Sequence, residues 1–226
     1  MSIKNSLKNI YENENVSAKQ LSEVFSGMLS GKLSAVQISA VLMALKYRGE
    51  SAEMIMGAAS SLLKAAIPFE VASDLNVVDC CGTGGDGKGL LNISTTVSFV
   101  AAACGLKVVK HGNRAVSSNS GSADVLEHLG IAPMDNVDIL KQQLTGIGLT
   151  FLFAPYFHPA LKQVMPVRKE LATRTLFNVL GPIINPARPR IQLMGVYDKT
   201  LCRPVAETLQ YLGCEHALVV HGSGLD

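Results

Sequence analysis

A loop with five glycines among eight residues runs from Gly82 to Gly89. Glycine has no side chain, so its backbone can approach a ligand closely and aim amide donors at it, which favours an anion. A simple turn rarely contains so many glycines, because each one costs conformational entropy on folding. The loop therefore predicts a phosphate-binding site.

The dinucleotide-binding fingerprint GxGxxG fits the spacing of Gly82, Gly84 and Gly87. That fold also needs an acidic residue at the end of its second strand, where it binds the ribose hydroxyls. The second predicted strand ends instead in Lys110 and His111. This departure argues against a dinucleotide site.

The Walker A spacing is also met in part, by Gly82, Gly87 and Lys88. Gly89 stands where that motif has a Ser or Thr that holds magnesium. Asp86 would in addition place a carboxylate among phosphates, which requires a metal ion or a cationic group between them. Neither well-known phosphate loop accounts for the sequence.

Two further polar segments complete a site for a heavily phosphorylated small molecule. Asn92 to Thr95 offers an amide, hydroxyls and free backbone donors at the start of a predicted helix, where the helix dipole favours an anion. Lys110 to Ser118 adds two fixed cations, at Lys110 and Arg114, and more hydroxyl groups.

These segments lie between strands and helices that alternate along the second part of the chain. Alternation of this kind predicts a mostly parallel sheet, and ligands of such sheets bind at the carboxyl ends of the strands, where both polar loops lie. The predicted strands are 77–81, 106–110, 149–153, 192–196 and 217–220, and the predicted helices are 94–104, 122–129 and 199–212.

The first 66 residues contain no strand pattern and predict an all-helical unit. Capping boxes at Ser17 with Gln20 and at Ser34 with Gln37 each precede apolar residues at helical spacing. Gly49 ends the second of these helices. We therefore expect an α/β protein with a helical domain over residues 1–71 and a mostly parallel α/β domain over residues 72–226.

Composition sets limits on the function. Of the 226 residues, 48% are hydrophobic and 17% are charged, which excludes a disordered chain, and a net charge of +2 does not favour a nucleic acid or a membrane as partner. The five cysteines are odd in number and form no CxxC pair, so we expect free thiols in a reducing cytoplasm rather than disulfides or zinc.

The polar segments resemble, in order, the signatures of the anthranilate phosphoribosyltransferase family. The similarity runs from the first helices to the last residue, and several long motifs make it far more specific than a lone glycine pattern. The matching segments are GTGGD at 82–86, NIST at 92–95, KHGNRAVSS at 110–118, GSADVLE at 121–127, HPA at 158–160, VRKEL at 167–171, RTLFN at 174–178 and GP at 181–182.

The resemblance implies a helical domain that forms a homodimer interface, an α/β domain beside it, and two substrates bound in the cleft between them. Transfer of the phosphoribosyl group of 5-phosphoribosyl 1-pyrophosphate (PRPP) to the amine of anthranilate would supply tryptophan biosynthesis. The residues implied for PRPP are Gly82, Gly85, Asp86, Asn92, Ile93, Ser94, Thr95, Lys110, His111, Gly112, Asn113, Arg114, Ala115, Val116, Ser117, Ser118 and Ser122.

Anthranilate and Mg²⁺ complete the implied site. Asn113 and Arg168 would contact anthranilate, with Gly82 near both substrates and with His158 and Pro182 lining the approach. Mg²⁺ would be held by Ser94 and Asp226. An arylamine carries a neutral lone pair at pH 7, so the implied reaction needs no strong general base, and no catalytic residue is assigned.

The sequence departs from the family pattern at three places. Leu90 stands at a usual hydroxyl position, and Ala172 replaces a usual glycine. The family continues beyond Asp226 with a glutamate that completes the magnesium site, and then with more strands and helices. We therefore expect an incomplete α/β domain with an unpaired sheet edge.

Three alternatives stay open. A pyrimidine-nucleoside phosphorylase would share this architecture, although Asn113 and Arg168 fit a carboxylated aromatic substrate better than a base. A nucleic-acid-binding relative would need a basic face that 20 Lys and Arg against 18 Asp and Glu do not supply. The third alternative is a folded but inactive truncated remnant.

Overall fold

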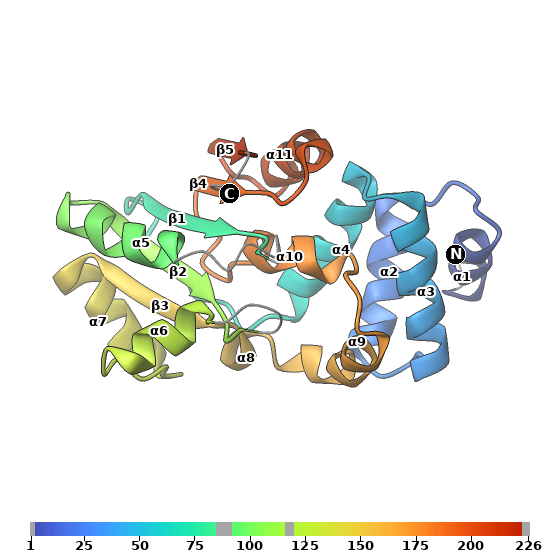
Figure 1. Ribbon diagram of the computed structural model, residues 1–226, viewed down its shortest axis with the longest axis horizontal. Coiled ribbons are helices and arrows are strands. Elements are labelled where there is room, and N and C mark those ends of the chain that lie inside the picture. The colour runs from blue at the N-terminus through green and yellow to red at the C-terminus, as the bar shows by residue number, and fades with distance from the viewer. Residues whose placement is uncertain (1–2, 85–91, 116–119, 223–226) are drawn as a thin grey trace.

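The computed structural model describes residues 3–84, 92–115 and 120–222. Several of the residues implied above lie outside these ranges, namely Gly85, Asp86, Leu90, Val116, Ser117, Ser118 and Asp226. In Figure 1, helices α1 to α4 form one end of the molecule, and a parallel sheet with its own helices forms the other.

The first part of the chain is helical, as predicted. Its helices are α1 (Ile3–Tyr11), α2 (Ala18–Leu29), α3 (Ala35–Arg48) and α4 (Ala52–Ala65). Both predicted capping boxes are present, at Ser17 with Gln20 and at Ser34 with Gln37, and Ser51 caps α4 through the backbone N–H of Met54.

Helix α1 is polar overall, and its aliphatic residues are Ile3, Leu7 and Ile10, at helical spacing. Leu7 and Ile10 are nevertheless buried against the neighbouring helices. The guanidinium group of Arg48 donates to the carbonyls of Asn9, Ile10 and Glu14 and so holds the end of α1 against α3. Tertiary packing, rather than local propensity, therefore stabilises this helix.

The sheet has five strands in the order β3-β2-β1-β4-β5, and all four pairings are parallel. The strands are β1 (Val77–Gly82), β2 (Lys107–Gly112), β3 (Leu149–Phe153), β4 (Ile191–Gly195) and β5 (His216–Val220). Each begins and ends within two residues of its prediction, and the predicted fold class is confirmed. Strand β5 pairs only with β4 among the described residues, and its Leu218 and Val220 are exposed.

Four of the helices that lie between these strands in the chain are placed beside the sheet in Figure 1. They are α5 (Ile93–Ala103), α6 (Ser122–His128), α7 (Val137–Ile147) and α11 (Cys202–Tyr211), the last preceded by a 3-10 turn, η2 (Lys199–Leu201). Helix α7 was not predicted from the sequence, although Asn136 caps its first turn and Gly148 follows it at a φ of 77°. No helix in the described ranges is both long and apolar enough to cross a bilayer.

The chain returns to the helical end after β3. It forms α8 (Ala154–Phe157), η1 (Pro159–Gln163), α9 (Met165–Leu171) and α10 (Phe177–Ile183), of which α9 and α10 lie beside α3 and α4 in Figure 1. Phe177 packs against Phe25 of α2, with 5.6 Å between the ring centroids. The helical core thus contains residues from both sides of position 71, and a division of the chain at that point stays a prediction.

Candidate functional site

The polar loops meet at the carboxyl edge of the sheet. Strands β1 and β2 are neighbours and end at Gly82 and Gly112. The start of the glycine-rich loop is anchored to β4, because the backbone N–H of Thr83 donates to the carbonyl of Gly195 at 3.0 Å and its hydroxyl accepts from the backbone N–H of Tyr197 at 3.0 Å. Gly84 has a φ of 60°, in the left-handed region that favours glycine.

Asn92, in the second polar segment, connects that segment to the chain just after the third. Its side-chain amide donates to the hydroxyl of Ser120 at 2.6 Å, which ties the start of α5 to the start of α6. Asn92 does not cap α5 through its side chain. In the first turn of α5, Thr95 is buried, whereas the hydroxyl of Ser94 has no hydrogen-bond partner among the described residues. Backbone donors and a free hydroxyl are therefore available at this helix start.

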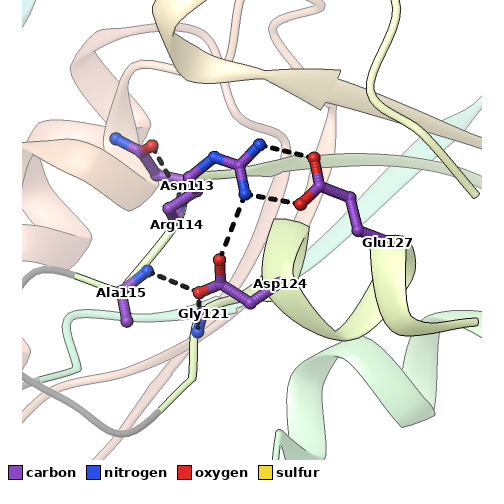
Figure 2. Close-up of polar contacts among 6 residues, drawn as sticks. All are labelled: Asn113, Arg114, Ala115, Gly121, Asp124 and Glu127. Carbon is purple, nitrogen blue, oxygen red and sulfur yellow. Dashed lines mark hydrogen bonds and ion pairs between the residues drawn. The ribbon is translucent and has the colours of Figure 1, made fainter.

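Asp124 braces the third segment, as Figure 2 shows. Its Oδ2 accepts from the backbone N–H groups of Ala115 at 2.9 Å and Gly121 at 2.7 Å, so one carboxylate holds the two residues that flank positions 116–119. These two hydrogen bonds lower the pKa of Asp124, and the charge of Arg114 adds to the effect. The sequence analysis did not single out Asp124, although its place three residues after Gly121 is that of a capping-box acceptor.

Arg114 is engaged in ion pairs rather than left as a free cation. Its guanidinium group makes two hydrogen bonds to the carboxylate of Glu127 and lies 3.5 Å from Oδ1 of Asp124 (Figure 2). It also lies over the ring of Phe153, 5.7 Å from the centroid. Arg114 therefore helps to position this segment, and its charge is largely neutralised before any anion binds.

Two glycines allow the third segment to pack closely against the start of α6 and against β3. A Cβ atom on Gly112 would lie 2.8 Å from Cε2 of Phe151 and 2.9 Å from Cβ of Ser122. A Cβ atom on Gly121 would lie 2.4 Å from the backbone nitrogen of Ala115. All three distances are below those that real Cβ atoms tolerate, so these positions require glycine.

Lys110 is almost fully buried at 3% exposure, and its Nζ donates to the carbonyl of Cys80 at 2.9 Å. Asp79, on the neighbouring strand, is also buried, and its Oδ2 accepts from Nδ2 of Asn185 at 2.9 Å. Burial raises the pKa of Asp79, and the positive charge of Lys110 partly opposes that rise. Lys110 thus places a positively charged side chain in β2, at the start of the third segment.

Near the end of β2, the ring of His111 contacts both His158 and the segment Gly181–Pro182. The imidazole Nδ1 of His111 is 3.2 Å from the carbonyl of Gly181, and the two histidine rings meet edge to face with 5.1 Å between centroids. The carbonyl of Pro182 accepts from Nε2 of Gln192 at 2.8 Å. The structure therefore brings together His158 and Pro182, which the resemblance assigned to the approach of anthranilate.

Arg168 lies apart from these loops, on α9. Its guanidinium group is 5.0 Å from the centroid of the Phe177 ring and 3.7 Å from the sulfur of Met165. Burial lowers its pKa, and no carboxylate pairs with it in the described ranges. A half-buried cation without an acidic partner is suited to the carboxylate of a ligand.

Metal ligands are sparse in the described part of the chain, which has no group of three or more His, Cys, Asp or Glu side chains placed to hold an ion. The two residues implied for Mg²⁺ are Ser94, at the start of α5, and Asp226, which the described ranges do not include.

Two family models match this chain, one over its α/β part and one over its first helices. A family model described as the α/β domain of a glycosyl transferase family matches residues 74–226, and a second model, the helical bundle domain of a glycosyl transferase family, matches residues 4–66. Anthranilate phosphoribosyltransferase from Idiomarina loihiensis is 52% identical over 220 residues, which are 97% of this chain and 65% of that protein. The chain thus spans slightly less than two thirds of the length of this relative.

Solved structures of similar proteins superpose closely. The anthranilate phosphoribosyltransferase of Thermus thermophilus is 43% identical, with a TM-score of 0.91 over 98% of this chain and 67% of its own. The Saccharomyces cerevisiae enzyme in complex with PRPP and Mg is 29% identical, with a TM-score of 0.86 over 96% of this chain and 64% of its own.

Proposed function

The chain belongs to the glycosyl transferase family, and from this premise we propose that it transfers the phosphoribosyl group of PRPP to the amine of anthranilate. The products would be N-(5-phosphoribosyl)anthranilate and pyrophosphate, in the biosynthesis of L-tryptophan. The observation that supports the proposal is that polar segments meet at one sheet edge, where hydrogen bonds of Asn92 and Asp124 hold them together. The relatives named above carry the same activity in their names.

PRPP would bind across the carboxyl ends of β1 and β2. The backbone at Gly82 and at the start of α5 supplies amide donors, and Lys110 supplies a fixed positive charge at the end of β2. Ser122 lies against Gly112 and adds a hydroxyl at the start of α6. Gly85, Asp86 and Ser118, which lie outside the described ranges, belong to the same proposed site.

Anthranilate would bind on the side of the site that faces the helical part. Arg168 would hold its carboxylate, Asn113 would contact it from the end of β2, and His158 and Pro182 would line its approach. Burial lowers the pKa of His158 to about 4 and that of His111 to about 3, so both rings are neutral at pH 7. A neutral wall leaves Arg168 as the cation that orients the aromatic acid.

We propose that Ser94 and Asp226 hold Mg²⁺, and of these two only Ser94 lies in the described ranges. The Ser94 hydroxyl is an oxygen ligand without another partner in the described structure, and Asp226 is the second proposed ligand. Mg²⁺ prefers oxygen ligands and commonly takes several of them from substrate phosphates. When bound, it would neutralise charge that develops on the departing pyrophosphate.

The protein's own residues would then act by positioning and by electrostatics. The anthranilate amine would form a bond to the anomeric carbon of the ribose while the bond from that carbon to pyrophosphate breaks. The nitrogen would then release one proton to water or to the departing pyrophosphate. Amide donors at the helix starts and Lys110 would stabilise the negative charge of the leaving group. Holding the two substrates in line would supply much of the rate, because the arylamine needs no prior deprotonation.

Two further expectations, on assembly and on location in the cell, belong to the same proposal. We propose a homodimer formed through the helical part, where Val36 and Tyr47 expose most of their apolar surface. We also propose a cytoplasmic location, since all five cysteines are free thiols.

The test is loss of anthranilate fluorescence on incubation of the purified chain with PRPP and Mg²⁺. The proposal predicts consumption that requires both PRPP and Mg²⁺ and that is at least about tenfold slower in Arg168→Ala at low anthranilate concentration, the cost of one charge-assisted contact. Consumption of thymidine with phosphate in place of anthranilate with PRPP would instead identify a nucleoside phosphorylase. A folded chain with neither activity would identify an inactive remnant.

A further inference from the structure

A cavity of about 500 Å³ lies at the opposite end of the sheet from the proposed substrate site. It is bounded by the connection from α4 to β1 and by the connection from α10 to β4. Val77, which lines it, is the first residue of β1, whereas Gly82 at the substrate site is the last. At about 3.3 Å per residue, the six residues of β1 separate the two sites by roughly 16 Å.

The floor of the cavity is apolar. Phe69 and Val77 are buried in a core that also contains Ala187, and Val71 and Leu75 pack against that core. Phe69 is fixed by an edge-to-face contact with Phe157, at 6.2 Å between centroids, and by a hydrogen bond from its backbone N–H to the carbonyl of Pro186 at 3.4 Å. The two connections are therefore held together, and the space between them is preformed.

The rim of the cavity carries two positively charged side chains and one negatively charged side chain. Arg188, Arg190 and Glu70 line it. Arg190 is paired with Glu215 at 3.4 Å, outside the cavity lining. The guanidinium group of Arg188 has no ion pair, side-chain hydrogen bond or ring contact among the described residues, so it is available to a ligand.

The backbone of Arg188 supports a role for its side chain. Arg188 has a φ of 47°, in the left-handed region where glycine is relaxed and a longer side chain is strained. An arginine at such a position costs stability relative to glycine. Strained positions of this kind concentrate where a side chain serves a ligand site.

We propose that this cavity binds a small organic carboxylate with an apolar body. The apolar floor would cover the body of the ligand, and the free guanidinium group of Arg188 would take its carboxylate, a pairing that arginine makes with two parallel hydrogen bonds. The volume lies within the range that holds small ligands. The site is distinct from the one proposed for anthranilate, which depends on Arg168.

The test uses ¹⁹F NMR of 5,5,5-trifluoropentanoate, an aliphatic probe, with 5,5,5-trifluoropentylamine as a probe of similar shape and opposite charge. For about ten non-hydrogen atoms, ordinary ligand efficiency predicts a dissociation constant of roughly 1–5 mM for the carboxylate. Arg188→Gly should weaken binding at least about tenfold. Its urea midpoint should equal or exceed that of the wild type, because glycine relieves the strain, so lost binding cannot come from unfolding. Arg168→Ala should leave the affinity unchanged.

Four results would overturn the proposal. They are no binding at concentrations of about 20 mM, several times the expected constant, equal affinity in Arg188→Gly, equal binding of the amine, or loss of binding in Arg168→Ala. The last result would place the carboxylate at the proposed anthranilate site. None of these results depends on whether the chain turns over anthranilate.

Discussion

The ring of His111 lies edge to face against the ring of His158, and three of their four nitrogens have no hydrogen-bond partner among the described residues. Burial lowers the pKa of His111 to about 3, with the neighbouring His158 adding to the effect. Burial also lowers the pKa of His158 to about 4, and the backbone of Ile184 opposes this only in part. Two neutral imidazoles thus form one wall below the sheet edge.

This pair makes the folded state sensitive to acid. Both histidines bind protons more readily in the unfolded chain, where a histidine side chain has its ordinary pKa of about 6.5. The stability that depends on these neutral rings is therefore fully present above pH 6.5. It is lost as the pH falls toward the pKa of each ring in the folded state, which is about 4 for His158 and about 3 for His111. Within that window, the titration of each ring lowers the free energy of unfolding by up to about 1.4 kcal/mol for each unit by which the pH falls.

His158→Phe isolates one of the two titrations, because phenylalanine keeps the ring and removes the nitrogens. Urea unfolding between pH 7 and pH 4.5 should show a slope against pH that is shallower than that of the wild type by up to about 1.4 kcal/mol per unit. The exposed His128→Gln variant serves as the control and should keep the wild-type slope. An unchanged slope in His158→Phe would contradict the account of this pair.

Ala172 has a backbone conformation that favours glycine, the residue that the family resemblance implies at this position. It follows α9 at a φ of 45°, in the left-handed region that a side chain disfavours. We expect Ala172→Gly to raise the free energy of unfolding, or at least not to lower it, with a gain of up to about 1 kcal/mol once the greater freedom of glycine in the unfolded chain is subtracted.

Ala40 is the matched control for this substitution, because it is exposed and lies inside α3. Ala40→Gly should lower the free energy of unfolding by roughly 0.5–1 kcal/mol, as glycine does in a helix interior. Equal losses in the two variants, measured by urea unfolding, would show that the backbone at Ala172 is not strained.

Arg168 should affect one substrate and not the other. If its guanidinium group holds the carboxylate of anthranilate, Arg168→Ala should raise the apparent anthranilate constant about 10- to 100-fold, the cost of a charge-assisted hydrogen bond. The apparent PRPP constant should change little. The neighbouring Lys169 is exposed, and Lys169→Ala should leave both constants near the wild-type values. An equal rise in both constants for Arg168→Ala would indicate a structural role against Phe177 instead.

Much of the fold could be predicted because its signals are local. Capping boxes, glycine punctuation and short apolar runs gave the helices of the first 66 residues and all five strands. Helices α9 and α10 were not predicted, because they are seven residues long, contain proline and are stabilised by packing against the first helices. A helix is predicted from helical periodicity and from capping residues, and neither signal is strong in α9 or α10.

The site shows the same division between local and distant information. The polar segments could be found from residue types, but the contacts that position them join residues far apart in the chain. Asn185 donates to Asp79, 106 positions away, and Asn92 donates to Ser120. The ion pair of Arg114 with Glu127 was also not predicted, so a residue expected to offer its positive charge to an anion is held by two carboxylates.

The most direct test of the central claim, that the sheet edge is a PRPP site, is calorimetric titration of the chain with PRPP in the presence of Mg²⁺. Lys110→Met should weaken binding at least about tenfold, since it removes a charged hydrogen-bond donor from the proposed site. Lys107 lies at the other end of β2 and donates to the carbonyl of Thr145, so Lys107→Met should bind PRPP as the wild type does. No binding by the wild-type chain, or equal affinity in Lys110→Met and Lys107→Met with both variants folded, would contradict the assignment of this edge to PRPP.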